Sequence, residues 1–343
     1  MSKFLVNGKF FAQRTTGVQR FARELLNALD PIISKDDLLV AIPLDAIDVP
    51  EYKNIKKLYV NTHASVFWDQ VKIPLLSKKY GIPALHLCHI APILKPDYVI
   101  IHDANVEVNP QWFTKKLVLW YTLIHWACAK WAKKIFTISD FSKKELEKVY
   151  KIPQSRIANV GNGWQHIEKI KADEKILQKC GLSRKKFYFS LGTKAPHKNL
   201  KWVFDYARKH PMETFAISGS TYNRIYGKVD THVPSNVRFL GYLSDSEIKF
   251  LMQNCKAFLF PSFYEGFGIP PLEALSTGCP VVCSDIPVMR EIFGRSVRYI
   301  DPHNTNIDLD DLLNESVSSI APVLERYSWE KSARKLLDFL KEN

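Results

Sequence analysis

The chain has 343 residues, of which 46% are hydrophobic and 12% aromatic, and this is enough apolar material for two hydrophobic cores. No apolar run reaches about 18 residues, so the sequence predicts no transmembrane helix. The start, MSKFLVNGKFF, lacks the apolar stretch of a signal peptide. Six scattered cysteines without a C-x-x-C pair favour reduced thiols in a cytoplasmic protein over a zinc site.

The positive charge of the chain is unevenly distributed. The net charge is +13, and residues 1–165 hold 23 Lys and Arg against 14 Asp and Glu. A basic first half indicates an anionic partner, which can be a phosphate group, a membrane surface or a nucleic acid. A basic surface that only keeps the protein in solution explains the charge equally well.

Short apolar runs alternate with longer amphipathic segments in the first half. The expected strands are Phe4–Asn7, Leu38–Ile42, Leu58–Val60, Ala84–Leu87, Tyr98–Ile101 and Ile135–Ile138. Helices are expected between them, for example at Val18–Leu29 and Lys115–Ala132. Apolar runs without alternation are typical of parallel strands that are covered on both faces. The repeated strand–helix order therefore predicts a doubly wound α/β domain.

The expected helix at Lys115–Ala132 has an apolar middle between lysine pairs. The apolar part, about 13 residues, is too short to cross a bilayer. We favour a helix buried against the sheet, because helices that are hydrophobic nearly all round usually lie in a core. The alternative is a helix lying in a membrane interface, with Trp120, Trp126 and Trp131 as anchors.

The regular alternation stops at residues 161–186, which predicts a domain junction there. A second set of strands is expected at Phe187–Leu191, Phe215–Ile217, Val237–Leu240, Ala257–Phe260 and Pro280–Cys283. The tail, Trp329–Leu340, has the pattern of an amphipathic helix. The sequence thus predicts a second α/β domain followed by a terminal helix.

The most informative segment spans residues 258–285, FLFPSFYEGFGIPPLEALSTGCPVVCSD. A buried strand is expected first, then a turn that contains Glu265, then a helix. Two prolines, Pro270 and Pro271, suit a first helical turn, where a missing N–H costs little. We expect Glu273 inside that first turn. Carboxylates that accept from hydroxyls, beside backbone amides at a helix start, suit a ligand with both hydroxyls and phosphates.

These residues resemble a known family. FYEGFGIPPLEAL followed by GCPVVCSD resembles the donor-site signature of the retaining glycosyltransferases of family 4, which have the GT-B fold. Further segments resemble the family in the same order, among them TTGVQRFARELLNAL, VIIHDAN, SLGTKAPHKNL and YSWEKSARKLLDFL. The resemblance implies an α/β protein with two Rossmann-like domains, whose parallel sheets face each other across a cleft. Residues 1–165 would bind the acceptor, 166–327 the nucleotide-sugar, and 328–343 would form a helix returning to the first domain.

The resemblance also implies roles for residues of the second domain. Glu273 matches the family's second glutamate, which accepts hydrogen bonds from ribose hydroxyls, and Glu265 matches the first, near the transferred sugar. Lys198 matches the lysine that stabilises the departing diphosphate. Backbone N–H groups for the sugar or diphosphate are implied at Gly266, Phe267 and Gly268. The alternatives are a first-turn acid that complements the helix dipole for Glu273, and a solvated loop acid for Glu265.

A second cationic contact to the phosphates is in doubt. The family often has an arginine soon after the glycine of this loop, where this chain has Thr193 followed by Lys194. Lys194 or His197 are the candidates to replace it. For His197, an ordinary surface histidine is an equal explanation.

Two residues of the first domain match the family's pattern. His102 matches the front-domain histidine, which implies a hydrogen bond with a sugar hydroxyl, and Asp103 is a candidate to orient its ring. A histidine packed locally at a strand end is the alternative. Gly17 matches a loop whose amides lie near phosphate or acceptor, although an ordinary helix start capped by Thr15 or Thr16 also explains it.

The implied activity is retaining transfer of a hexose-type sugar from a GDP-sugar or UDP-sugar to a saccharide acceptor. The resemblance is strongest to bacterial mannosyl- or rhamnosyltransferases of surface polysaccharides such as O-antigen or capsule. It implies a lipid-linked acceptor and contact with an anionic membrane at the inner face of the plasma membrane. The first alternative is a nucleotide-sugar epimerase or hydrolase of the same fold. The second, suggested by the net charge alone, is a non-enzymatic nucleic-acid-binding protein, for which no recognised motif is present.

We expect neither a metal nor a cofactor. The string Asp308-Leu309-Asp310 has the D-x-D spacing of metal-dependent transferases of another fold. Three letters carry little information, so we interpret it as a polar loop.

Overall fold

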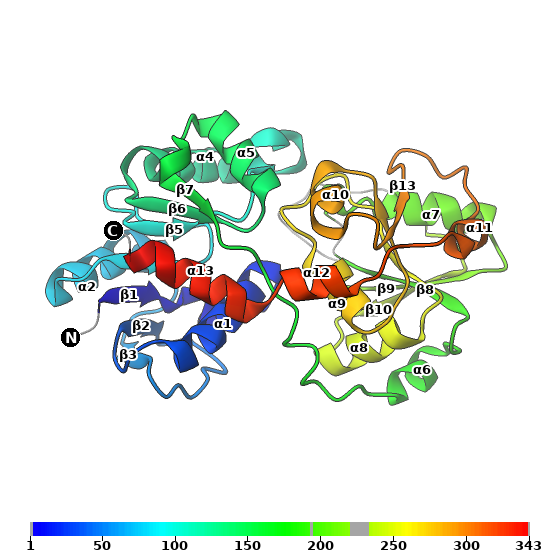
Figure 1. The fold of residues 1–343 in the computed structure, drawn as a ribbon, viewed down its shortest axis with the longest axis horizontal. Coiled ribbons are helices and arrows are strands. Elements are labelled where there is room, and N and C mark those ends of the chain that lie inside the picture. Colours follow the sequence, from blue (N-terminus) through cyan, green and yellow to red (C-terminus); the bar gives the residue numbers. More distant parts are fainter. Residues whose placement is uncertain (1–2, 193–194, 220–232, 342–343) are drawn as a thin grey trace. The chain divides into compact units, whose positions relative to one another are not determined.

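The protein consists of two compact units, shown in the computed structural model of Figure 1. The structure describes residues 3–192, 195–219 and 233–341. The first unit contains residues 3–108, 115–163 and 327–341. The second unit contains 109–114 and the described part of 164–326. The sequence did not indicate that a segment within the first 165 residues packs with the second unit.

A parallel sheet with the strand order β3-β2-β1-β4-β5-β6-β7 forms the centre of the first unit. The strands are β1 (Phe4–Asn7), β2 (Leu38–Pro43), β3 (Lys56–Val60), β4 (Ala84–His86), β5 (Tyr98–Ile100), β6 (Lys134–Thr137) and β7 (Ile157–Asn159). The six predicted strands are present. The edge strand β7 was missed, because its sequence, IAN, is too short and polar to stand out.

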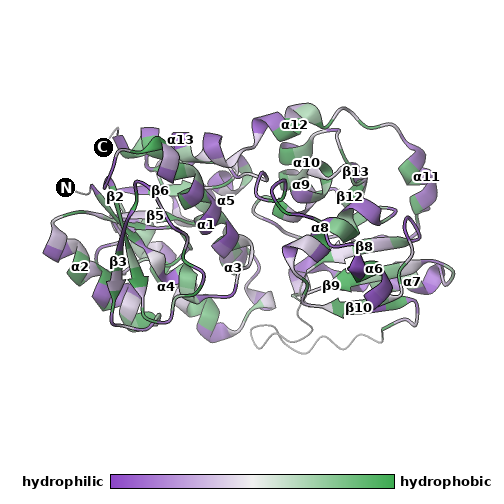
Figure 2. Ribbon diagram, turned by 90° about the horizontal axis from the view of Figure 1, so that it is seen from below, coloured by the Kyte–Doolittle hydropathy of each residue, from purple (hydrophilic) through white to green (hydrophobic). Residues whose placement is uncertain are grey.

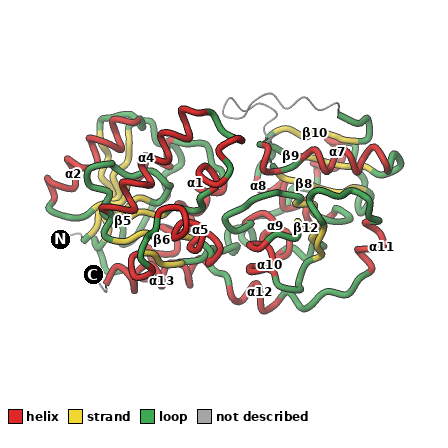
Figure 3. Tube along the Cα trace, turned by 90° about the horizontal axis from the view of Figure 1, so that it is seen from above, coloured by secondary structure: helices red, strands yellow, loops and turns green. Residues whose placement is uncertain are grey.

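Helices cover both faces of this sheet. They are α1 (Gly17–Leu29), α2 (Ile73–Tyr80), α3 (Asn105–Val108), α4 (Lys115–Trp131), α5 (Asp140–Tyr150) and α13 (Trp329–Lys341). Strand register places Leu5, Ala84 and Val99 on one face, where α2 packs through Ile73 and α4 through Ile124. Figures 2 and 3 show α13 on one side of the sheet and α4 on the other.

The terminal helix α13 packs on α1 and on the face of the sheet opposite α4. Its Trp329 ring contacts Phe21 with 5.9 Å between ring centroids, and its Phe339 ring contacts Phe136 at 6.2 Å. Trp329 is almost fully buried. The end of the chain therefore completes the core of the first unit.

Backbone contact between Gly163 and α13 gives a prediction for stability. A Cβ added at Gly163 would lie 2.3 Å from the Trp329 backbone nitrogen and 2.7 Å from its ring. We expect Gly163→Ala to lower the free energy of unfolding by about 1–3 kcal/mol, because α13 must shift. Gly17→Ala is the matched control, since a Cβ there meets nothing within 4 Å. Denaturant unfolding measures both, and equal stability of the two variants would contradict the prediction.

The second unit is built on a parallel sheet with the order β10-β9-β8-β11-β12-β13. Its strands are β8 (Phe187–Leu191), β9 (Thr214–Ser218), β10 (Val237–Gly241), β11 (Phe258–Phe260), β12 (Val281–Ser284) and β13 (Arg298–Ile300). Its helices are α6 (Lys175–Cys180), α7 (Leu200–Lys209), α8 (Asp245–Asn254), α9 (Ile269–Ser276), α10 (Pro287–Phe293), α11 (Leu309–Asn314) and α12 (Ala321–Arg326). The predicted strands are present, and β13 was missed. Two α/β units with parallel sheets confirm the predicted fold class.

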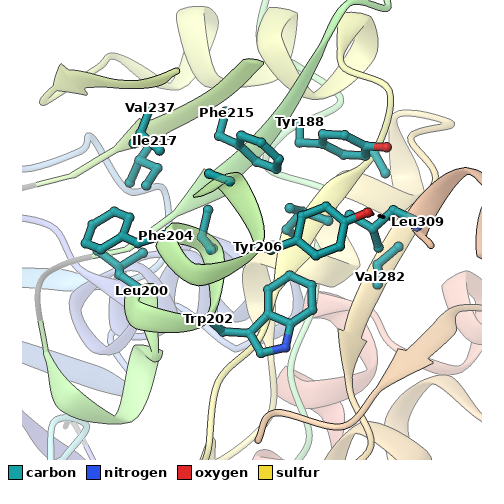
Figure 4. Close-up of a cluster of buried hydrophobic side chains, with 14 of the residues drawn as sticks. Tyr188, Leu200, Trp202, Phe204, Tyr206, Phe215, Ile217, Val237, Val282 and Leu309 are labelled. Carbon is teal, nitrogen blue, oxygen red and sulfur yellow. Dashed lines mark hydrogen bonds between the residues drawn. The ribbon is translucent and has the colours of Figure 1, made fainter. Parts of the chain in front are cut away.

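Helix α7 is fixed to this sheet by a dense aromatic core (Figure 4). The rings of Trp202 and Tyr206 stack with 5.2 Å between centroids, and Tyr206 also meets Phe215 of β9 edge-on. The Tyr206 hydroxyl accepts a hydrogen bond from the Leu309 backbone N–H at 3.0 Å, which ties α11 to the same core. The start of α7, which directly follows Lys198 and Asn199, is therefore held in place by this core.

All six cysteines are free thiols, and four of them are buried, namely Cys128, Cys255, Cys279 and Cys283. Among the described residues, no helix is both long enough and apolar enough to traverse a membrane.

Candidate functional site

Helix α9 starts one residue before the prolines, at Ile269, with Gly268 as its N-cap. Gly268 has φ +104°, and a Cβ there would lie 2.9 Å from the Met289 methyl carbon, so this position requires glycine. Glu273 is consequently the fifth residue of α9 and lies outside the first turn. The expectation of a first-turn position was wrong, because Ile269 already has helical geometry.

Lys198 and Glu265 meet although 67 residues separate them. The Lys198 Nζ donates to Glu265 Oε1 at 2.7 Å, and the two side chains are 23% and 13% exposed. The ammonium also lies 5.2 Å from the ring centroid of Phe260. A cation and a carboxylate thus lie together beyond the carboxyl ends of the adjacent strands β8 and β11, where ligands bind in open α/β sheets.

Backbone and side-chain hydrogen bonds hold the two loops together. Asn199 follows the 3₁₀ turn Pro196–Lys198 with φ +52°, and its amide donates to the Pro261 carbonyl at 2.9 Å and the Pro302 carbonyl at 2.8 Å. The Phe263 N–H donates to the His197 carbonyl at 2.8 Å. These bonds fix the distance between Lys198 and the Glu265 loop, so the ion pair is set by the backbone.

Glu273 has a partner that sequence reasoning missed. His166 Nε2 donates to Glu273 Oε1 at 2.7 Å, and both side chains are buried, at 5% and 11% exposure. His166 lies in GNGWQH, which we interpreted only as a turn at the domain junction. Only one feature of the sequence could have indicated this role of His166, namely its position at the end of a glycine-containing turn that follows a strand. One carboxylate oxygen of Glu273 is therefore positioned by an imidazole.

His197 is buried among aromatic rings. It lies 6.1 Å from Trp112 and 6.4 Å from Phe113, measured between ring centroids, and both rings come from the 109–114 segment of the second unit. Burial and the neighbouring Lys198 charge lower the pKa of His197 to about 3. The ring is therefore neutral near pH 7 and supplies no second positive charge. Thr193 and Lys194 lie outside the described residues.

His102 and Gly17 belong to the first unit. His102 follows β5, and its Nε2 donates to the Leu87 carbonyl at 3.0 Å, because a carbonyl oxygen can only accept. Burial, together with His89, lowers the pKa of His102 to about 3, so this ring is neutral as well. The Asp103 side chain accepts from the Asn105 backbone N–H at 2.9 Å. Gly17 is the first residue of α1 and follows the N-cap Thr16.

The two aspartates of the D-x-D string both have structural partners. Asp308 is the N-cap of α11 and accepts from the Asp310 and Asp311 backbone N–H groups. Asp310 accepts from Lys256 Nζ at 2.9 Å and the Tyr188 hydroxyl at 3.0 Å, and the Lys256 bond lowers its pKa. The string therefore starts a helix and was wrongly interpreted as a loop. Within the described ranges, no three or more His, Cys, Asp and Glu side chains are arranged to hold a metal ion.

Comparison with known proteins identifies the class. Residues 172–336 match the family model described as glycosyl transferases group 1. The chain is 26% identical to O-antigen chain mannosyltransferase B of Escherichia coli, over 95% of this chain and 96% of the relative. It is 24% identical to O-antigen chain mannosyltransferase RfbU of Salmonella typhimurium, over 99% of both chains. The structure of Anabaena Alr3699/HepE in complex with UDP and glucose superposes with a TM-score of 0.70, at 15% identity and 100% coverage of both chains.

The fold is GT-B, and the protein is a glycosyltransferase. Within that class, the model of the glycosyl transferases group 1 family matches residues 172–336. These residues include β8, β11 and α9, and with them Lys198, Glu265 and Glu273. The predicted fold and enzyme class are confirmed.

Proposed function

We propose that the protein transfers a mannosyl residue, with retention, from a nucleoside-diphosphate sugar to a lipid-linked saccharide during O-antigen or related surface-polysaccharide synthesis. The observation that carries the proposal is the Lys198–Glu265 ion pair, which lies in the matched family region together with Glu273. The donor sugar is proposed because two relatives that match nearly end to end are O-antigen chain mannosyltransferases. We place the reaction in the cytoplasm, at the inner face of the plasma membrane.

Glu273 is proposed to bind the ribose of the donor. Its Oε1 accepts from His166, so the remaining lone pairs of the carboxylate can accept from the two vicinal ribose hydroxyls. Because His166 already restricts the Glu273 side chain, the carboxylate loses little conformational entropy when it binds the diol. His166 is then a positioning residue for donor binding.

We therefore expect His166→Phe to raise the KM for the donor about tenfold, because it removes a hydrogen bond to a charged group. kcat at saturating donor should change much less, because His166 does not touch the reacting sugar. His166→Gln keeps an N–H donor and should recover part of the affinity. Steady-state kinetics with varied donor measure this split. If His166→Phe leaves the donor KM unchanged, His166 has no role in donor binding.

Lys198 and Glu265 are proposed to act on the reacting end of the donor. The ammonium has three N–H groups, of which one bonds Glu265, so the others are available to the phosphate oxygens of the leaving diphosphate. Negative charge grows on this group as the glycosidic bond breaks, and a fixed cation stabilises it. Glu265 complements the positive charge that develops at the anomeric carbon and binds sugar hydroxyls. The leaving phosphate itself helps to accept the acceptor proton in a front-side attack.

His102 is proposed to accept a hydrogen bond from a donor-sugar hydroxyl. Its Nε2–H is engaged by the Leu87 carbonyl, so Nδ1 carries the lone pair. The lowered pKa keeps this nitrogen unprotonated throughout the neutral range. A neutral acceptor of this kind positions the sugar without opposing the positive charge at the anomeric carbon.

The test is transfer assayed with GDP-mannose, GDP-rhamnose, UDP-glucose and UDP-N-acetylglucosamine, in the presence and absence of a polyprenyl-linked saccharide. Acceptor-dependent transfer from GDP-mannose, with an α-anomeric product by NMR, is the expected result. Donor turnover without acceptor would favour the epimerase or hydrolase. A covalent glycosyl group trapped on a carboxylate would overturn front-side attack. Salt-dependent shift of a random oligonucleotide, without transfer from any donor, would favour the nucleic-acid-binding alternative.

We propose catalysis without a metal ion, with Lys198 neutralising the diphosphate. Full activity is expected in excess EDTA. The measurement is the initial rate before and after chelation. A loss of activity that manganese restores would contradict this proposal.

A further inference from the structure

Each of the two sheets has one point where the order of its strands changes direction. In the second unit this point lies between β8 and β11, where Lys198 meets Glu265. In the first unit it lies between β1 and β4, because β2 and β3 extend the sheet on one side and β5 to β7 on the other. Ligands of open α/β sheets bind beyond the carboxyl ends of the strands at such a switch point. The carboxyl ends of β1 and β4 are therefore the place where we expect a ligand of the first unit.

A second lysine–carboxylate pair lies at this point of the first unit. Lys9 belongs to the 3₁₀ helix Gly8–Ala12 directly after β1, and its Nζ donates to Asp69 Oδ2. The Lys9 side chain is 21% exposed and the Asp69 side chain 2%. Lys198 likewise lies in a 3₁₀ helix, Pro196–Lys198, which follows β8 along the chain. Each unit thus brings a lysine of such a turn against a carboxylate from a distant segment.

Asp69 is held in place by a buried network. Its Oδ1 accepts from Asn7 Nδ2 at 3.0 Å, and Asn7 Oδ1 accepts from the Trp68 indole N–H at 2.7 Å. The aspartate lies in a π-helical turn, Trp68–Lys72, a rare geometry that is frequent at functional sites. Burial raises the pKa of Asp69, although Lys9 and Asn7 act to lower it. Since a buried ion pair is a weak source of stability, the network indicates a role in binding.

A cavity of about 40 Å³ lies beside the pair. Its polar lining comes from Asn7, Lys9, Gln13 and Asp69, and Phe10 contributes to its apolar wall. The volume accommodates hydroxyl groups but not a whole sugar ring. Carboxylate and amide oxygens accept from hydroxyls, and ammonium and amide N–H groups donate to them. A phosphate group fits less well, because the Asp69 charge opposes it.

We propose that Lys9 and Asp69 bind hydroxyl groups of the saccharide acceptor in this cavity. Lys9 donates one N–H to Asp69 and one to the Ser65 carbonyl at 3.0 Å, which leaves the third for an acceptor oxygen. Each Asp69 oxygen accepts one of these protein hydrogen bonds and has a further lone pair for a hydroxyl. The inference deepens the proposed function and rests on it, because it assigns the acceptor of that transfer to the switch point of the first sheet.

The experiment is saturation-transfer NMR of the full chain, without nucleotide, with the octyl glycosides of mannose, rhamnose, glucose and N-acetylglucosamine. Saturation should reach the ring protons of at least one glycoside, which then serves as the probe. Asp69→Asn should raise the Kd of the probe about tenfold, because hydrogen bonds to a charged group are lost. The substitution keeps the shape of the side chain and leaves no buried charge unpaired, since Lys9 is partly exposed. Asp338→Asn, an exposed position on α13 of the same unit, is the matched control.

Gln13→Met is a second variant, which leaves the ion pair intact. Gln13 is half-buried at the end of the 3₁₀ helix, and methionine has a similar length. Loss of the amide should raise the Kd of the same probe about threefold. In steady-state transfer, both variants should raise the acceptor KM and leave the donor KM unchanged. A purely structural role would not produce this split.

Three results would overturn the proposal. These are wild-type protein that binds none of the four glycosides, an unchanged Kd in Asp69→Asn, and a rise in the donor KM equal to the rise in the acceptor KM. A failure of the donor proposal would instead appear as no transfer from GDP-mannose, while the probe still binds and its binding still depends on Asp69. The two failures are therefore distinguishable.

Discussion

Replacing Lys198 with alanine is expected to lower kcat by about 10²- to 10³-fold, because a preorganised charge opposite the leaving group contributes that much in other enzymes. The KM for the donor should rise less than kcat falls, since the charge on the leaving phosphate grows mainly in the transition state. Single-turnover rates at saturating donor measure the effect. Lys201→Ala is the matched control, because Lys201 is an exposed residue of α7 that pairs with Asp205 on the same helix.

The ion pair itself complicates this test, since Lys198→Ala leaves Glu265 without its cation. A double-mutant cycle with Glu265→Gln separates the two effects. If Lys198 serves only to neutralise Glu265, the double variant should recover activity. If both residues act on the donor, it should be at least as slow as the worse single variant. Recovery would remove Lys198 from the catalytic machinery.

Changing Glu273 to glutamine is expected to weaken binding of the nucleoside diphosphate about 10- to 100-fold. The substitution keeps the shape of the side chain but removes the charge that strengthens hydrogen bonds from the ribose hydroxyls. Titration calorimetry and the thermal stabilisation by GDP or UDP report the loss. Glu168→Gln, an exposed acid of the same unit, is the control. Undiminished stabilisation by the diphosphate would show that the ribose binds elsewhere.

Glu273 and His166 should behave as a unit. If the histidine acts by holding the carboxylate, Glu273→Gln combined with His166→Phe should cost little more than Glu273→Gln alone. Additive losses would instead indicate that each residue contacts the donor separately. This distinction does not depend on which base the nucleotide carries.

The sequence predicted the long apolar strands and the order of strands and helices, because both follow from local patterns. It missed β7 and β13, which have three residues each. The formation of such a short strand depends more on pairing with a neighbouring strand than on its own apolar content. The sequence also placed Glu273 inside the first turn of α9, because the two prolines suggested a helix start later than Ile269. Boundaries of this kind depend on backbone angles that composition does not determine.

The approach of Lys198 to Glu265 could not be derived from local pattern. It depends on β8 and β11 being neighbours in the sheet, with the sequence of β9 and β10 lying between them along the chain. Only the resemblance to a family suggested that these residues share a site. The resemblance did not indicate His166 either, because a sequence does not distinguish a buried histidine from an ordinary histidine in a turn.

The segment Asn109–Thr114 has a practical consequence for exchanging parts between relatives. It is encoded between α3 and α4 of the first unit, yet its Trp112 and Phe113 cover His197 in the second. A chimera joined only at residues 163 and 327 would supply these two rings from the wrong parent. Transplanting donor specificity into this scaffold should therefore move the segment together with residues 164–326.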